Sequence, residues 1–161
     1  MSDRAVGDVE DITRYVGGSH FDAATGQVNA SAFDRSPKDV DGLSVNRVGV
    51  FSREIRDDRF ELRRVMASRM KIGKTAVFVQ FNVGDALSAL AEFEEEIFVA
   101  ADPLVADGVG LANPAHAVIV GLPFKGEAIG SLKAELAGDR LRAVIKDTFP
   151  AVQTASGSST P

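Results

Sequence analysis

The sequence predicts an α+β domain: a mixed or antiparallel sheet of four to six strands, with two long helices and one short helix packed on one face. Short runs rich in Val, Ile and Phe are interspersed, in mixed order, with longer runs whose apolar residues recur at helical spacing. The 161 residues, 45% of them hydrophobic and 25% charged, suffice for one ordinary domain with a real core.

Polar and small residues dominate both ends of the chain. We therefore expect residues 1–11 and 150–161 to be disordered, and a single domain to span residues 12–149. The density of Asp, Asn, Ser, Gly and Pro over 22–42 predicts turns and loop, with room for one short strand around Val28.

The predicted elements begin with a strand at 43–51, followed by Ser52 as the N-cap of an amphipathic helix at 53–70. In order, the remaining elements are a strand at 74–84, a short helix at 86–96 capped by Asp85, strands at 97–103 and 113–123, and a long helix at 126–149 that Gly138 weakens.

Composition excludes several classes of protein. Because the chain has no cysteine, disulfides, cysteine-ligated zinc, iron–sulfur clusters and thiol nucleophiles are excluded, which favours a cytoplasmic location. No apolar run approaches the roughly 20 residues of a membrane helix, and the acidic start of the chain is unlike a secretory signal. We expect a soluble protein with no membrane contact.

The charges are unevenly distributed along the chain. The net charge of −5 argues against a general nucleic-acid binder. Residues 1–80 carry 13 Lys and Arg against 12 Asp and Glu, while residues 81–161 carry 5 against 11. Residues 53–74 are locally basic, but Phe60 is the one aromatic residue among their arginines, which weakens a single-strand stacking interpretation.

Two motifs suggest ligands and are set aside. The segment KIGKT (71–75) lacks the first glycine of a phosphate loop and joins a helix to a strand, the reverse of the order such a loop needs. His20, Asp22 and His116 match the outline of a two-histidine, one-carboxylate metal triad, but too few strands remain for the usual barrel. We therefore predict no metal and no other cofactor.

The two histidines of the chain, His20 and His116, form a hypothetical acid–base pair. Imidazole exchanges protons near neutral pH, so one ring could deprotonate a hydroxyl nucleophile while the other protonates the leaving group. Alternatively, His116 alternates with Val118 and Val120 as a core residue would, and His20 beside Gly17 and Gly18 caps a turn.

Four further residues complete the predicted site. Arg14 and Arg47 would bind phosphate through their planar guanidinium groups, and Ser44 or Tyr15 would orient the substrate. The arginines could instead be paired with nearby carboxylates. No serine lies in a G-x-S-x-G motif, so the sequence lends no support to an acyl-transfer nucleophile.

The segments RYVGGSHF, GLSVNR and NPAHAVIVGLP together resemble a small uncharacterised bacterial family that shares SHF, LSV-x-R and HA-x-I-x-G-x-P segments. The resemblance covers about a third of the chain and implies no particular activity. It groups Arg14, His20, Ser44, Arg47 and His116.

Two functions follow as hypotheses. The first is an anion- or nucleotide-binding site with phosphoester or glycosidic chemistry on a nucleotide or RNA. The second is a non-catalytic interaction module, such as an inhibitor or immunity-type protein, whose acidic surface meets a basic partner. The oligomeric state is open.

Overall fold

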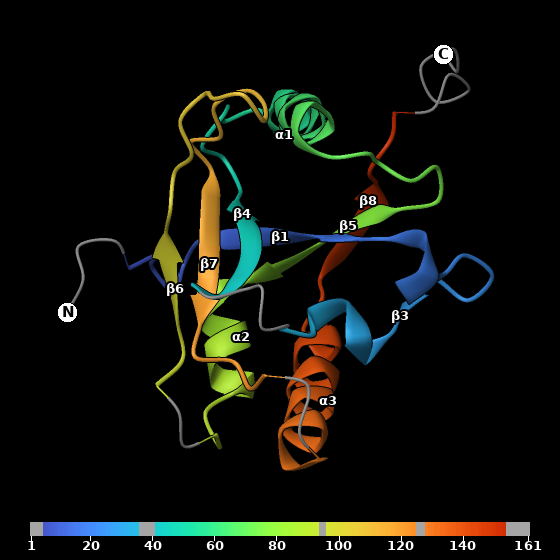
Figure 1. Ribbon diagram of the computed structural model, residues 1–161, viewed down its shortest axis with the longest axis vertical. Helices are drawn as coiled ribbons and strands as arrows, with labels where there is room; N and C mark the ends of the chain where they lie inside the picture. Colours follow the sequence, from blue (N-terminus) through green and yellow to red (C-terminus); the bar gives the residue numbers. More distant parts are fainter. Residues whose placement is uncertain (1–4, 36–40, 94–95, 125–127, 154–161) are drawn as a thin grey trace.

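The computed structural model describes residues 5–35, 41–93, 96–124 and 128–153 and contains a six-stranded antiparallel sheet (Figure 1). In spatial order its strands are β6 (Phe98–Ala101), β7 (His116–Val120), β4 (Leu43–Arg47), β1 (Asp11–Val16), β5 (Val77–Asn82) and β8 (Asp147–Pro150). The predicted α+β class is confirmed.

Among the described residues, the other elements are three helices, a small hairpin and two short turns of 3-10 helix. They are α1 (Ile55–Arg69), α2 (Val83–Ala89), α3 (Ala128–Ala143), the strands β2 (Phe21–Asp22) and β3 (Gln27–Val28), and the turns η1 (Gly18–His20) and η2 (Ala30–Phe33). KIGKT lies between α1 and β5, as the predicted helix-to-strand turn. Within the described ranges, no helix is long and apolar enough to span a bilayer.

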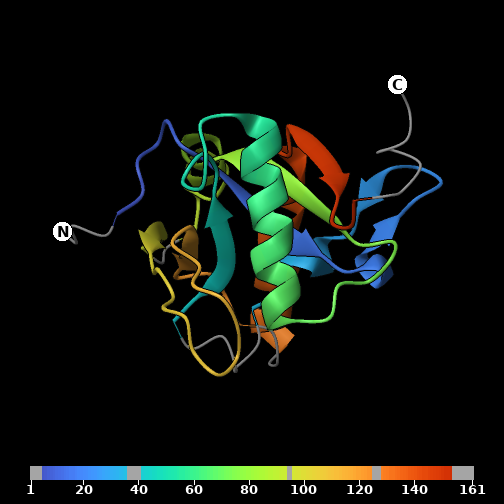
Figure 2. The ribbon, with the colours of Figure 1, turned by 90° about the horizontal axis from the view of Figure 1, so that it is seen from above.

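Helices cover both faces of the sheet, not one face as the sequence predicts. Figure 1 shows α1 on one side and α2 and α3 on the other, and Figure 2 looks onto α1 lying across the sheet. Phe78 of β5 packs with Leu62 of α1, whereas Val79 and Phe81 belong to the larger core with Leu141 of α3. A strand that is apolar on both sides needs cover on both sides.

Two strands of the six-stranded sheet were not predicted. β1 lies in the middle of the sheet, and its sequence DITRYV mixes charged and apolar residues ahead of a glycine pair, which resembles a turn. β8 overlaps the end of the helix predicted at 126–149, and that prediction extends too far because Val144 and Ile145 continue the apolar stripe of α3. In the structure α3 ends at Ala143, and the residues from Asp147 onward pair with β5 instead of continuing the helix.

The start of the chain and the helix ends also differ from expectation. Val6, placed by the sequence in a disordered terminus, is buried and donates its backbone N–H to the Val99 carbonyl, while residues 1–4 and 154–161 lie outside the described residues. Ser52 is not the N-cap of α1 as predicted: Glu54 occupies that position, and Ser52 Oγ accepts from the Glu54 N–H. The cap of α2 is Asn82, whose side chain accepts from the Asp85 N–H.

Gly138, which weakens α3 in isolation, lets that helix pack closely on η2. A side chain at this position would bring its Cβ to 3.0 Å from the Ala30 Cβ and closer still to the Ala30 carbonyl. Such distances require the backbone of η2 to move. The glycine is therefore explained by packing, not by helix propensity.

We expect Gly138→Ala to lower the free energy of unfolding by about 1–3 kcal/mol, since overpacking outweighs the roughly 1 kcal/mol that alanine gains in helix propensity. Urea denaturation followed by circular dichroism measures the change. Gly17→Ala is the control, because its φ of −63° suits alanine and nothing lies within 4 Å of the added Cβ. An unchanged or raised stability for Gly138→Ala would contradict the close contact.

Candidate functional site

A hydrogen-bonded group forms around His116 on the face of the sheet that carries α1. Its Nε2 lies 3.2 Å from Ser44 Oγ. Its Nδ1 lies 2.8 Å from the Asp102 carbonyl oxygen and 3.2 Å from Asp102 Oδ2. The His116 side chain is 14% exposed and that of Asp102 is 37% exposed, so the group borders solvent.

Strand register brings these three residues together. His116 of β7 lies opposite Asn46 of β4, so Ser44, two residues away on the same face, is its diagonal neighbour. On the other side, β6 and β7 pair up to Ala101, and the Asp102 N–H then donates to the His116 carbonyl. Asp102 therefore sits across from His116 at the end of β6.

The hydrogen-bond partners define the tautomer of His116. Both atoms of Asp102 near Nδ1 are acceptors, so Nδ1 carries the hydrogen. The lone pair of Nε2 then faces the Ser44 hydroxyl, which donates to it. A hydroxyl, a neutral imidazole that can accept its proton, and a carboxylate that orients the imidazole are the parts of a nucleophilic relay.

Arg14 joins this group through the main chain. β1 and β4 pair through Ile12–Arg47 and Thr13–Asn46, and beyond these pairs the Arg14 side chain connects the two strands. Its Nη1 donates to the Ser44 carbonyl at 2.8 Å, and its Nε donates to the Ala32 carbonyl at 3.1 Å. The Arg14 side chain lies on the same face as Ile12 and Val16, opposite to the Ser44 and His116 side chains. Of the predicted site residues, the structure therefore brings Ser44 and His116 together, while Arg14 contacts only the main chain of Ser44.

Arg47 and Tyr15 lie apart from the relay. Arg47 follows Asn46 in β4, so its side chain projects from the opposite face to His116, where Nε and Nη2 donate to the two carboxylate oxygens of Glu10. The Tyr15 hydroxyl accepts from the Gly73 N–H, and its ring packs on Phe78. Both sets of contacts are structural. For Arg47, the partner is a carboxylate, which is the alternative that the sequence offered for the arginines.

His20 is in η1, beyond the end of β1. Its Nδ1 lies 2.8 Å from Ser31 Oγ, and its backbone N–H donates to the Gly17 carbonyl, as a turn residue would. The adjoining β2–β3 hairpin and β7 lie at opposite ends of the molecule in both Figure 1 and Figure 2. The structure therefore does not bring His20 and His116 together, either as an acid–base pair or in the metal triad with Asp22.

Asp102 is the member of the group that the sequence did not single out. Its one local signal is its position directly after a buried strand and before Pro103, a position that carries no chemistry by itself. Across the described part of the chain, no group of three or more His, Asp or Glu side chains could hold a metal ion.

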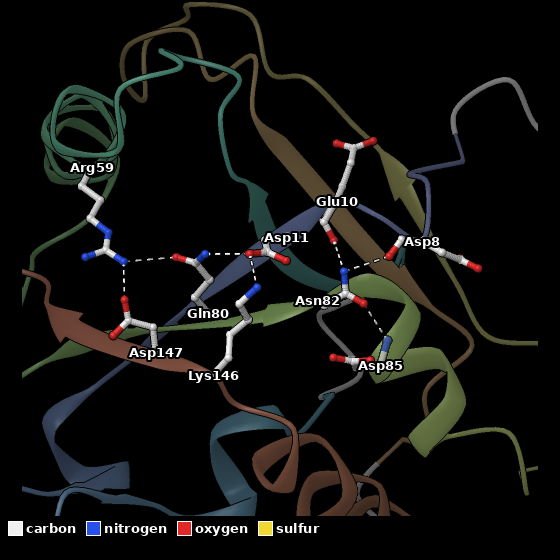
Figure 3. Close-up of polar contacts among 9 residues, drawn as sticks. All are labelled: Asp8, Glu10, Asp11, Arg59, Gln80, Asn82, Asp85, Lys146 and Asp147. Atoms are coloured by element: carbon white, nitrogen blue, oxygen red, sulfur yellow. Dashed lines mark hydrogen bonds and ion pairs between the residues drawn. The ribbon is translucent and has the colours of Figure 1, made fainter.

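A second polar cluster lies on the same face, beneath the first half of α1 (Figure 3). Arg59 donates to Asp147 Oδ2 at 2.6 Å and to Gln80 Oε1 at 3.2 Å. Gln80 Nε2 and Lys146 Nζ each lie 2.8 Å from Asp11 Oδ2. Through these bonds the cluster is a structural link between α1, β1, β5 and β8, although the buried Arg59 Nε has no hydrogen-bond partner among the described residues.

Asp11 has a lowered pKa within this cluster. Burial raises the pKa of its carboxyl, but the hydrogen bonds from Lys146 and Gln80 and the charge of Lys146 outweigh that effect. The carboxylate form of Asp11 therefore stabilises the folded protein.

Comparisons with protein-family models, with curated proteins and with solved structures find no match for this chain.

We expect Asp11→Asn to reduce the loss of stability on acidification. The folded-state pKa of Asp11 is depressed, so its contribution is present above the unfolded pKa of about 3.9 and is lost as pH falls through the folded value. Unfolding free energies measured from neutral pH down to about pH 2.5 should fall less steeply in the variant. Asp8→Asn, at an exposed position, is the control, and equal slopes for all three proteins would contradict the assignment.

Arg14→Ala should lower the free energy of unfolding by about 1–3 kcal/mol, because the carbonyls of Ala32 and Ser44 lose their donor. Chemical denaturation measures the change, with the exposed Arg56→Ala as the matched loss of charge. A residue that serves only as a substrate clamp would leave stability unchanged, and that result would contradict the structural role.

Proposed function

We propose that this protein is a hydrolase or transferase in which the Ser44 hydroxyl is the nucleophile. His116 is the general base, and Asp102 orients it. The observation that carries the proposal is the pair of contacts on one ring: Nε2 faces Ser44 Oγ at 3.2 Å, while Nδ1 is held by Asp102. A Ser–His–Asp relay is recognised by this geometry and not by chain order or a local motif.

The proposed reaction proceeds in two halves. Ser44 Oγ attacks the electrophilic carbon or phosphorus, and its proton moves to His116 Nε2. The Asp102 carboxylate, 3.2 Å from Nδ1, stabilises the imidazolium that forms. Nε2–H then protonates the leaving oxygen, and a water molecule activated by the same nitrogen releases the acyl or phosphoryl group from Ser44.

The relay itself limits the substrate to an ester whose carbon or phosphorus a hydroxyl can attack. The Arg14 side chain lies on the face of Ile12 and Val16, opposite to Ser44 Oγ, and contacts Ser44 only at its carbonyl, so it is a structural contact and not a substrate clamp. The phosphoester of a nucleotide or RNA is one substrate class that the relay could act on. Carboxylic esters remain the simplest probes of the same relay.

The test is covalent labelling with a fluorophosphonate, which reacts with activated serine hydroxyls. We expect a single adduct on Ser44 by intact mass and peptide mapping, no adduct in Ser44→Ala, and labelling slowed about 10²–10⁴-fold in His116→Ala. Ser19→Ala, an exposed serine outside the relay, should label like the wild type.

The competing interpretation is that these contacts only hold β4, β6 and β7 together. In that case Ser44→Ala and His116→Ala would lower the melting temperature, and the wild-type protein would not label. Labelling that persists in Ser44→Ala would equally refute the proposal. Turnover of p-nitrophenyl acetate and of bis-p-nitrophenyl phosphate by the same variants distinguishes acyl from phosphoryl substrates.

A further inference from the structure

A groove lies along the first half of α1, on the flank facing the end of β8. It has a volume of about 700 Å³, within the usual range for small-molecule sites, and its lining includes Ile55, Arg56, Arg59, Phe60, Arg63 and Gln153. Among the described residues that line the groove, Asp57 is the single carboxylate, against three guanidinium groups. On a chain of net charge −5, this surface is locally positive.

Arg63 has no carboxylate partner among the described residues. Its Nε donates to the Pro150 carbonyl at 3.0 Å and its Nη1 to Gln153 Oε1 at 2.9 Å, both uncharged acceptors. Arg59 lies beside it, since the two guanidinium carbons are 3.8 and 5.4 Å from the centre of the Phe149 ring. Burial and the charge of Arg59 lower the pKa of Arg63, and an anion in the groove would offset the repulsion between the two guanidinium groups.

Phe60 and Arg56 face outward in the same groove. Phe60 is 60% exposed and Ile55 is 54% exposed, which leaves a flat ring and an aliphatic surface open to a ligand. Arg56 and Arg63 lie one turn before and one turn after Phe60 on α1. Within the described part of the chain, no hydrogen bond or ion pair engages the Arg56 side chain.

We infer that this groove binds nucleotide phosphates, with the phosphates at Arg56 and Arg63 and the base stacked on Phe60. Guanidinium groups bind phosphate through a planar fork, and an exposed aromatic ring stacks on any base. An acidic peptide would engage the arginines but would leave the ring without a planar partner. The shared chemistry is a phosphate joined to a base, whether in a free nucleotide or in a single strand.

The groove is separate from the proposed relay. It lies on the β8 flank of α1, whereas β4 and β7, which carry Ser44 and His116, lie on the other flank (Figure 2). The inference therefore does not depend on the proposed function. Ser44→Ala should bind the same ligand as the wild-type protein does.

The test is fluorescence anisotropy with a fluorescein-labelled oligouridylate of about 12 nucleotides, in about 50 mM salt. We expect saturable binding that Phe60→Ala weakens about tenfold and Arg56→Ala weakens several-fold. Arg56→Ala should also reduce, by about 0.7, the magnitude of the slope of the logarithm of the association constant plotted against the logarithm of the salt concentration. Both side chains are exposed, so these variants keep the fold, whereas Arg63→Ala also removes contacts to Phe149 and Pro150.

The matched control is Arg64→Ala. It removes the same charge from the same helix, but Arg64 is paired with Glu61 and lies outside the groove. Arg64→Ala should bind within about twofold of the wild type. Equal weakening by Arg64→Ala and Arg56→Ala would overturn the inference in favour of general electrostatic attraction.

Competition identifies the source of the ligand. Displacement by unlabelled ATP supports a free-nucleotide site, and displacement only by unlabelled oligouridylate supports a single strand. The inference is overturned if the wild-type protein does not bind the labelled strand up to about 1 mM protein. It is also overturned if an acidic peptide displaces the strand as well as unlabelled strand does.

Discussion

The period-two alternation of side chains along the central strands decides which residues of this protein meet. In β1, Ile12 and Val16 face the core that α2 and α3 cover, while Tyr15 packs in the cluster beneath α1. In β4 the same rule places the Ser44 and Arg47 side chains on opposite faces, because the two residues are an odd number of positions apart. A shift of one residue in the pairing register of a strand would move each of its side chains to the opposite face of the sheet.

The two faces of the sheet differ in kind. The face toward α2 and α3 is an apolar core, whereas the face toward α1 carries most of the buried polar groups, which are tied by specific bonds. Asp58 of α1 accepts from the backbone N–H groups of Phe51 and Ser52, and Asn46 accepts from Asn113. Thr13 Oγ1 and Arg59 Nε are the buried side-chain atoms of the described residues that have no hydrogen-bond partner. Because the other buried polar groups of this face are paired by specific bonds, the face specifies where α1 lies.

The long connection between β6 and β7 links α1 to the relay. Asp102 lies at its beginning and His116 just after its end. Arg69, near the end of α1, donates to the carbonyls of Leu111 and Val105, and the Leu111 N–H donates to Ser68 Oγ. The last turn of α1 therefore anchors the loop that holds Asp102 and His116 in register. The first half of the same helix carries the groove lined by Arg56, Arg59 and Arg63.

By itself the sequence determined the α+β class and the elements with strong local periodicity: α1 and the strands β4, β5, β6 and β7, each within a few residues. It also singled out Arg14, Ser44 and His116 by chemical type. Only the tertiary structure decided that β1 and β8 are strands, that helices cover both faces, that Asp102 joins His116, and that His20 and Arg47 do not. The reason is that these outcomes depend on strand pairing and side-chain packing between residues far apart in the chain, which local patterns do not encode.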